Sequence, residues 1–360
     1  MENSADKPRT VKAYAALEAG AELTPYEFEA PPLGPHGIEI SIKFCGVCGS
    51  DVHLLNSDGG YSDFTSWAAG AGPQICGHEC IGTVTGVGSA VEHLKLGQRA
   101  GIGWQSAACH SCEWCLKGDE QLCSAVKCTC CEGNKGAFAD YIRINDGRFA
   151  FAIPDGCDPA ATAPLLCGGQ TVWTPLRQQT KAGDKVGILG LGGLGTMALK
   201  FARALGTEVY AISSSLSKKE EALEMGAHHF IAHGDEAQMT EYAASLDFIL
   251  VTIATQEPID AAKFFALLRP RGTLCFAGMC PPITADVFTM GFTMHNVTTT
   301  NTGGRKEMLE MLEFCARHKI GATVKERPMS EINDVLKELH STKAAARYVV
   351  TREDAVPVAS

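Results

Sequence analysis

Residues 185–206, KVGILGLGGLGTMALKFARALG, have the pattern of a buried strand followed by a glycine turn and a helix. Gly190, Gly192 and Gly195 form a G-x-G-x-x-G motif within this stretch. Glycine at these positions permits a tight turn, close approach of a pyrophosphate and packing of the helix on the strand. Because a second strand-like segment follows at 208–213, the stretch predicts a βαβ unit that binds a dinucleotide on the helix N-terminus.

The end of the second strand bears on which dinucleotide binds. NAD enzymes usually place an acidic residue there, which bonds to the ribose 2′-hydroxyl. This chain has hydroxyl and ammonium groups instead, from Ser213, Ser214, Ser215, Lys218 and Lys219. Since no carboxylate repels a 2′-phosphate, we predict NADP(H) rather than NAD(H). The serines also have a simpler interpretation, as polar residues before a helix that Ser217 caps, and both interpretations can hold. The predicted cofactor contacts further include Gly193, Leu194 and Thr171.

The remaining pattern predicts the fold class and the domains. Further strand-like segments occur at 246–254, 272–278 and 296–300, with helical segments between most of them. This alternation predicts an α/β fold with a doubly wound parallel sheet of about six strands. Short Val-, Gly- and Pro-rich pieces in the first part of the chain predict an irregular β-rich domain. We assign the β-rich domain to 1–160, the dinucleotide domain to 161–305 and a return to the first domain to 306–360.

Composition limits the possible function. The 360 residues are 45% hydrophobic with a net charge of −10, which argues against nucleic acid or an anionic membrane as the main partner. The N-terminus lacks the apolar core of a signal peptide, and no run of about 18 apolar residues occurs. We therefore expect a cytoplasmic protein whose 16 cysteines stay reduced and, where clustered, bind metal.

One segment concentrates cysteines. CHSCEWCLKGDEQLC, residues 109–123, contains Cys109, Cys112, Cys115 and Cys123. Four thiolates at short spacing supply the ligands of a closed tetrahedral zinc site, with little loop-closure entropy to overcome. Such a site stabilises a loop and leaves no position for a substrate. The alternative is a disulfide pair or idle thiols.

A second set of potential ligands is scattered. Cys48 lies in GVCGSDVH, His78 in GHEC and Cys167 in PLLCGG. If they converge, the two thiolates and one imidazole form a zinc site with an open fourth position, as catalytic zinc sites have. Spacing alone leaves this undecided, because isolated cysteines are usually core residues.

The order of these motifs, followed by GLGGLG, resembles the zinc-containing medium-chain alcohol dehydrogenases. PLLCGG, GLGGLG and SSSLSKKEEALEMGA resemble the cinnamyl alcohol dehydrogenase-like branch of broad aldehyde reductases. The resemblance extends from about Lys12 to about Val350 and implies a GroES-like catalytic domain, a Rossmann domain and a homodimer. It implies catalytic zinc ligands Cys48, His78 and Cys167, with Glu79 as an alternative ligand. It also implies a proton relay through Ser50 and then His53, although His53 by itself has the simpler interpretation of a surface or packing histidine.

The resemblance therefore implies an NADP(H)-dependent enzyme with two Zn²⁺ ions per chain that interconverts small-molecule aldehydes and primary alcohols. Zinc acts as a Lewis acid on the carbonyl, and the nicotinamide transfers hydride. Two alternatives stay open: an NAD-dependent polyol or secondary-alcohol dehydrogenase, and a zinc-stabilised redox sensor without catalysis. An apolar pocket for aromatic or medium aliphatic substrates is expected near Trp67, Trp104, Phe292 and Met294, although either tryptophan is equally an ordinary core residue.

Two features depart from the family pattern. Gly49 stands where many relatives have His and others Arg, a side chain that often contacts the cofactor pyrophosphate. The cluster Cys128, Cys130 and Cys131 is also outside the pattern. These thiols are either reactive or metal-binding groups, or accidental thiols of a loop.

Overall fold

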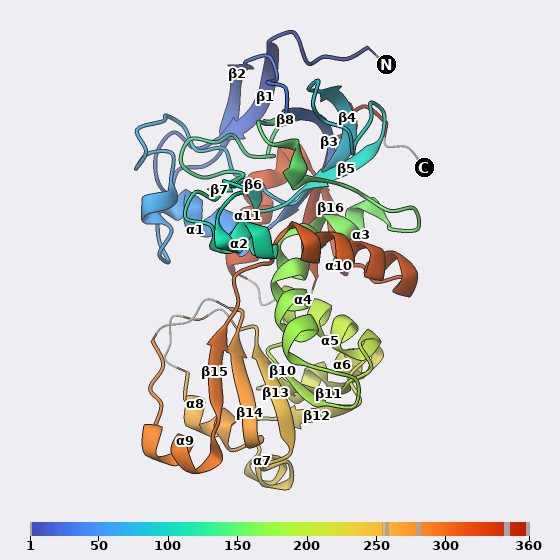
Figure 1. The fold of residues 1–360 in the computed structure, drawn as a ribbon. Coiled ribbons are helices and arrows are strands. Elements are labelled where there is room, and N and C mark those ends of the chain that lie inside the picture. Colours follow the sequence, from blue (N-terminus) through green and yellow to red (C-terminus); the bar gives the residue numbers. More distant parts are fainter. Residues whose placement is uncertain (1, 254, 256–258, 279–281, 342–345, 358–360) are drawn as a thin grey trace. The chain divides into compact units, whose positions relative to one another are not determined.

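The computed structural model describes residues 2–253, 255, 259–278, 282–341 and 346–357. The chain forms two compact units. The first unit comprises 1–167 and 303–360, and the second comprises 168–302. In Figure 1 the C-terminal helices α10 (Arg305–His318) and α11 (Ile332–Ser341) lie among the N-terminal elements of the first unit.

The first unit contains a seven-stranded sheet in the order β16-β17-β3-β4-β5-β9, with β8 also paired to β3. Its strands are β3 (Ile38–Val47), β4 (Cys80–Val87), β5 (Arg99–Ile102), β8 (Tyr141–Ile144), β9 (Ala150–Ala152), β16 (Val324–Pro328) and β17 (Arg347–Thr351). Two smaller sheets pair β1 (Arg9–Ala15) with β2 (Thr24–Ala30) and β6 (Gln105–Ala107) with β7 (Lys127–Cys128). The antiparallel pairing of β17 with the central strand β3 ties the C-terminal segment into this unit.

Helices and a hydrophobic core complete the first unit. The helices are α1 (Gly49–Asn56), α2 (Glu113–Lys117), α3 (Pro159–Thr162), α10 (Arg305–His318), α11 (Ile332–Ser341), and the 3₁₀ helices η1 (Ser62–Phe64), η2 (Glu120–Leu122), η3 (Gly147–Phe149), η4 (Ala163–Leu166) and η6 (Met329–Glu331). Ile38, Ile40 and Ile42 of β3 are fully buried in the core cluster. β3 therefore forms a rigid centre, and the chain leaves its end at Cys48 to begin α1.

The second unit is a six-stranded sheet in the order β12-β11-β10-β13-β14-β15, and every pair in it is parallel. Its strands are β10 (Lys185–Leu189), β11 (Glu208–Ser213), β12 (His229–Ala232), β13 (Leu246–Val251), β14 (Leu268–Phe276) and β15 (Asn296–Thr299). The α/β fold with a parallel sheet is as predicted. The segment predicted as a strand over 246–254 forms strand only to Val251, and Ala254 lies outside the described residues.

The second unit has helices α4 (Gly168–Gln179), α5 (Gly193–Ala204), α6 (Lys219–Glu224), α7 (Glu236–Glu241), α8 (Ala261–Phe265), α9 (Val287–Thr293) and the 3₁₀ helix η5 (Leu216–Lys218). Trp173 of α4 packs edge-on against Phe201 of α5, with ring centroids 5.4 Å apart, so the glycine-turn helix is supported by a large buried contact. Within the described part of the chain, no helix is both long enough and apolar enough to cross a membrane.

Candidate active site and zinc centres

Potential ligands from three distant segments converge inside the first unit. Cys48, His78, Glu79 and Cys167 place one ligand atom each within 4.8 Å of one another. Cys48 is the N-cap residue of α1, His78 and Glu79 immediately precede β4, and Cys167 follows η4. All are buried, with His78 and Glu79 fully inaccessible. The structure thus brings together the residues that the sequence offered from separate motifs.

The backbone before His78 requires glycine. Gly77 has a φ of +94°, and a Cβ at this position would lie 2.7 Å from the backbone nitrogen of Phe138. Both the left-handed conformation and the close contact exclude a side chain. In the motif GHE, the backbone conformation and packing at Gly77 thus require glycine directly before the cluster residues His78 and Glu79.

Asp51 orients the imidazole of His78. The Nδ1 atom of His78 lies 3.0 Å from Asp51 Oδ1, and the carboxylate also accepts from the backbone N–H groups of Gly77 at 2.8 Å and Cys48 at 2.9 Å. Since an ionised carboxylate can only accept, Nδ1 carries the donated hydrogen, and the neutral imidazole then presents the lone pair of Nε2 to the cluster. Nε2 is buried and has no hydrogen-bond partner among the described residues, an arrangement that is costly unless a metal or donor fills it.

The donor set fits Zn²⁺. Hydrogen bonding with Cys167 lowers the pKa of the Cys48 thiol well below its ordinary value, and the nearby Arg347 guanidinium acts in the same direction. A thiolate, a second cysteine and an imidazole nitrogen held by a carboxylate are the groups that catalytic zinc sites use.

The carboxylate of Glu79 is held by Arg347. Arg347 Nη2 donates to Glu79 Oε1 at 2.5 Å, while Oε2 is buried without a hydrogen-bond partner among the described residues. Burial raises the pKa of Glu79 to about 8, and Arg347 opposes this rise. A Cβ on Gly46 would collide with the Glu79 side chain. One carboxylate oxygen is thus anchored and the other stays available near the ligands.

Hydroxyl and aromatic groups border the cluster. Ser50 Oγ lies 3.8 Å from Cys48 Sγ. Trp104 packs edge-on against His78, with ring centroids 4.8 Å apart. His53, one turn after Ser50 on α1, pairs through Nδ1 with Asp58 Oδ1 at 2.5 Å. Trp67 donates its indole N–H to the Leu17 carbonyl at 3.0 Å and packs against the core.

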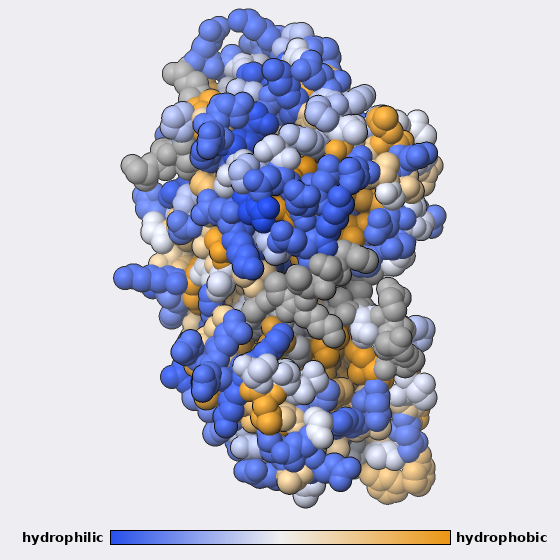
Figure 2. All heavy atoms as spheres, turned by 180° about the vertical axis from the view of Figure 1, so that it is seen from behind, coloured by the Kyte–Doolittle hydropathy of each residue, from blue (hydrophilic) through white to orange (hydrophobic). Residues whose placement is uncertain are grey.

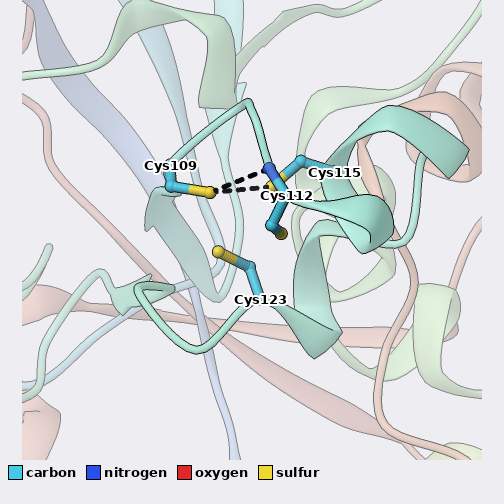
Figure 3. A group of neighbouring side chains, drawn as sticks. All are labelled: Cys109, Cys112, Cys115 and Cys123. Carbon is cyan, nitrogen blue, oxygen red and sulfur yellow. Dashed lines mark hydrogen bonds between the residues drawn. The ribbon is translucent and has the colours of Figure 1, made fainter.

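The four-cysteine loop forms a separate cluster in the first unit. Cys109, Cys112, Cys115 and Cys123 also place their sulfur atoms within 4.8 Å of one another, and Figure 3 shows the four side chains directed toward a common centre. The Cys109 and Cys115 sulfur atoms are 3.9 Å apart, and no disulfide joins the four. Hydrogen bonds from backbone N–H groups lower the pKa of Cys109 to about 5. This geometry matches a closed tetrahedral zinc site with four thiolate ligands.

The glycine turn of the second unit has the geometry expected of a pyrophosphate cradle. Gly190 follows β10 with a φ of +97°, and a Cβ on Gly195 would collide with the Gly190 carbonyl. Gly192 is the N-cap residue of α5, so Gly193 and Leu194 occupy its first turn. The backbone N–H groups of a first helical turn are suited to an anion.

The residues predicted to select the cofactor lie at the end of β11. Ser213 ends the strand, Ser214 is exposed, and Ser215 caps η5 by accepting from the Ser217 N–H at 3.3 Å. Lys218 Nζ donates to the Leu191 carbonyl at 3.2 Å, which places its ammonium group beside the glycine turn.

Other candidates lie elsewhere. Thr171 is in α4, where its carbonyl accepts from Thr300 Oγ1 at 3.4 Å. Phe292 and Met294 are 77% and 56% exposed, and they lie in and just after α9. The structure therefore assigns neither of these two residues to a pocket.

The extra cysteines pack beside the candidate centre. Cys130 and Cys131 are buried in the core of the first unit. Cys130 Sγ lies 3.8 Å from His78 Nδ1, on the side where Asp51 also binds. Cys130 is thus a direct neighbour of His78, and Asp51, His78 and Cys130 place one ligand atom each within 4.8 Å of one another.

Comparison with known proteins identifies the family of this chain. A family model of the alcohol dehydrogenase GroES-like domain matches residues 34–155, and one of the zinc-binding dehydrogenases matches residues 193–317. The chain is 35% identical over 343 residues to an aldehyde reductase, AdhA, of Synechocystis, covering 95% of this chain and 98% of that protein. The chain belongs to the zinc-containing medium-chain alcohol dehydrogenases.

Solved structures place it near the cinnamyl alcohol dehydrogenase-like branch. A cinnamyl alcohol dehydrogenase of Sorghum bicolor is 32% identical with a TM-score of 0.86, covering 95% of this chain and 98% of the other. The Helicobacter pylori enzyme complexed with NADP(H) is 29% identical with a TM-score of 0.85, covering 97% and 100%. The resemblance stated from the motifs is confirmed, as is the combination of a GroES-like and a Rossmann domain.

Sequence reasoning did not select Asp51 and Arg347, which hold His78 and Glu79 in this candidate site. Asp51 occupies the third position of α1 after the N-cap Cys48, so the motif GVCGSDVH contained a detectable signal in an acid at a helix start. Arg347 comes from the C-terminal strand β17, and nothing in its local sequence points to Glu79. Only the pairing of β17 with β3 places it there.

Gly49, the departure from the family pattern, is the first residue of α1. A Cβ at this position would meet no heavy atom within 4 Å, and its φ is not positive. Neither backbone conformation nor local packing in the first unit requires glycine here.

Proposed function

We propose that this chain is an NADP(H)-dependent zinc alcohol dehydrogenase that interconverts aldehydes and primary alcohols, with aromatic or medium aliphatic substrates. The observation that supports it most directly is the convergence of Cys48, His78 and Cys167 beside the Ser50 hydroxyl. The names of its relatives, an aldehyde reductase and cinnamyl alcohol dehydrogenases, support the same reaction class.

Each residue has a defined part in this proposal. When bound, zinc supplies Lewis acidity to the substrate oxygen and the nicotinamide exchanges hydride. Two cysteine thiolates balance the charge of the dication, and His78, held by Asp51, binds through Nε2. Glu79 is the alternative ligand. Ser50 accepts the hydroxyl proton during alcohol oxidation and returns it during reduction, with His53 and Asp58 as the following groups.

A second zinc ion is proposed in the four-cysteine loop, where it stabilises structure only. The two ligand clusters are separate sets of side chains, and the four thiols of the loop already complete the coordination of a tetrahedral ion.

Cofactor preference tests the proposal. With benzaldehyde as substrate, we expect kcat/KM to be about a hundredfold higher for NADPH than for NADH, because a charge-assisted bond to phosphate contributes one to two decades of affinity. Lys218→Met should reduce this preference, and Lys181→Met, at an exposed lysine before β10, is the matched control. Initial rates with both coenzymes give the answer, and equal use would contradict the assignment of the serines and Lys218.

We also propose a homodimer through the open edge of the second unit's sheet. β15 is the terminal strand of that sheet, and α9 beside it exposes Val287, Phe288 and Phe292 by 76% or more. Figure 2 shows apolar atoms gathered at the lower right, where α9 lies. An open strand edge next to an exposed apolar patch is suited to pairing with a second copy across a twofold axis.

Light scattering tests the dimer. We expect the mass of two chains for the native protein and of one chain for Phe288→Asp, because a buried unpaired charge disfavours the interface. Leu17→Asp, at an exposed leucine in the first unit, should stay dimeric. A monomeric native protein would contradict the assignment.

The cytoplasm is the proposed compartment, since reducing conditions keep the ligand thiols free.

The alternatives differ in measurable ways. An NAD-dependent polyol or secondary-alcohol dehydrogenase would need an acidic residue at the end of β11, where Ser213 stands. A redox sensor without catalysis would bind zinc but show no turnover with any aldehyde and either coenzyme.

A further inference from the structure

Tyr61 lies directly beside Ser50. Its phenolic oxygen is 3.1 Å from Ser50 Oγ, and either hydroxyl can donate. Ser50 Oγ also lies 3.8 Å from Cys48 Sγ, a longer contact with a weaker hydrogen-bonding atom. The Ser50–Tyr61 bond is therefore the stronger of these two constraints on the Ser50 hydroxyl.

A glycine turn brings Tyr61 to this position. Gly59 and Gly60 have φ values of +59° and +87°, and the Tyr61 N–H donates to the Asp58 carbonyl at 2.9 Å. Two consecutive left-handed residues within such a turn define a primed type I turn, which reverses the chain tightly. The segment after α1 thus returns toward the start of the same helix, where Ser50 lies.

Neighbouring rings hold the phenol. Tyr61 stacks on His53 with ring centroids 5.9 Å apart and planes 7° apart, and it meets Trp104 edge-on at 6.1 Å. Burial raises the pKa of Tyr61 to about 12, so its hydroxyl keeps its proton under physiological conditions. The phenol is a fixed, protonated hydrogen-bonding group.

Ser50 needs such a partner for proton transfer. A serine hydroxyl rotates among three staggered positions, and it can both donate and accept. Only an orientation that leaves a lone pair toward the substrate oxygen accepts the alcohol proton. Without an anchor, the Ser50 hydroxyl is free to turn toward the Cys48 sulfur instead.

We propose that Tyr61 is a positioning residue that orients the Ser50 hydroxyl for proton transfer. This inference rests on the proposed dehydrogenase function. It gives the relay hydroxyl of Ser50 a fixed partner that is in place before any cofactor binds, because the bond lies entirely within the first unit.

A double-mutant cycle tests the inference. Single-turnover oxidation of benzyl alcohol at saturating NADP⁺ is measured for the native protein, Tyr61→Phe, Ser50→Ala and the double variant, because product release can mask the chemical step. We expect about a tenfold loss for Tyr61→Phe and about a hundredfold loss for Ser50→Ala, within the usual range of general acid–base contributions. The double variant should match Ser50→Ala within about twofold, since Tyr61 acts through Ser50.

Binding controls separate positioning from folding. Zinc content and NADP⁺ affinity, measured by fluorescence, should not change in Tyr61→Phe. Tyr26→Phe, which removes a phenol oxygen from β2, should retain the native rate.

The same four proteins provide a readout without turnover. Urea unfolding of the cofactor-free forms should give non-additive shifts in the midpoint, because each single variant already breaks the Ser50–Tyr61 bond. Additive midpoints would show that the bond does not exist in solution and would overturn the inference. Multiplicative rate losses would also overturn it, by showing that Tyr61 acts independently of Ser50. A native protein without turnover would instead refute the proposed function, and the inference would fall with it.

Discussion

Cys48→Ala is expected to lower the zinc content from two ions per chain to one and turnover by at least about a thousandfold. A Lewis-acid metal contributes several kcal/mol of transition-state stabilisation, and each 1.36 kcal/mol corresponds to a decade in rate. Cys48 supplies one of the two thiolates of the candidate centre. Its removal leaves His78 and the single thiolate of Cys167, and the charge of Glu79 is already offset by its ion pair with Arg347, so the remaining groups bind a dication more weakly.

Metal analysis after gel filtration, combined with initial rates, checks this expectation. Cys45→Ala is the matched control, because Cys45 is a fully buried cysteine of the preceding strand β3 and is not part of the ligand cluster. It should keep both ions and the native turnover. A native protein that holds a single ion, unaffected by Cys48→Ala, would refute the catalytic centre.

Cys115→Ser is expected to remove the other ion and to lower the free energy of unfolding by about 3 kcal/mol or more. Structural zinc sites contribute roughly 10 kcal/mol of apparent binding free energy, which becomes folding free energy when the loop is disordered without metal. The loop also supports α10. Glu120 Oε2 accepts from the Arg305 N–H at 3.0 Å, and a Cβ on Gly304 would collide with the Gly118 carbonyl.

Urea unfolding and metal analysis of Cys115→Ser measure the loss of stability and the loss of the ion. The single-turnover rate at low temperature should stay near native, because the proposed catalytic ligands are different residues from the four cysteines of the loop. Lys117→Ala is the control, since this exposed residue of α2 ion-pairs with Glu113 on the surface and has no ligand atom in the cluster. Loss of an ion without loss of stability would show that the four-cysteine loop does not stabilise the fold.

The fold was predictable because its signals are local. The glycine motif at Gly190, Gly192 and Gly195 encodes a turn whose close contacts at Gly190 and Gly195 leave no room for a side chain, and the alternation of strands and helices follows from short-range patterning. The four-cysteine loop was equally predictable, because its potential ligands lie within one segment and can be recognised without knowledge of distant contacts.

The candidate centre was only partly predictable. Cys48, His78 and Cys167 were selected by resemblance, because spacing alone does not distinguish ligands from core cysteines. Asp51 left a weak signal at the start of α1. Tyr61 and Arg347 left none, since their partners depend on a turn and on a strand pairing. The placement of Cys130 against His78 was likewise invisible in the sequence.

The sequence by itself determined the glycine turn, the parallel α/β pattern and the four-cysteine segment, because these depend on backbone conformation and on residues close together along the chain. The tertiary structure alone decided which polar atoms surround His78, Glu79 and Ser50. Their partners Asp51, Arg347 and Tyr61 are brought near by a helix start, the pairing of β17 with β3, and a turn after α1. Such contacts depend on the packing of the whole first unit, and the low dielectric constant of the buried site then strengthens each of these hydrogen bonds.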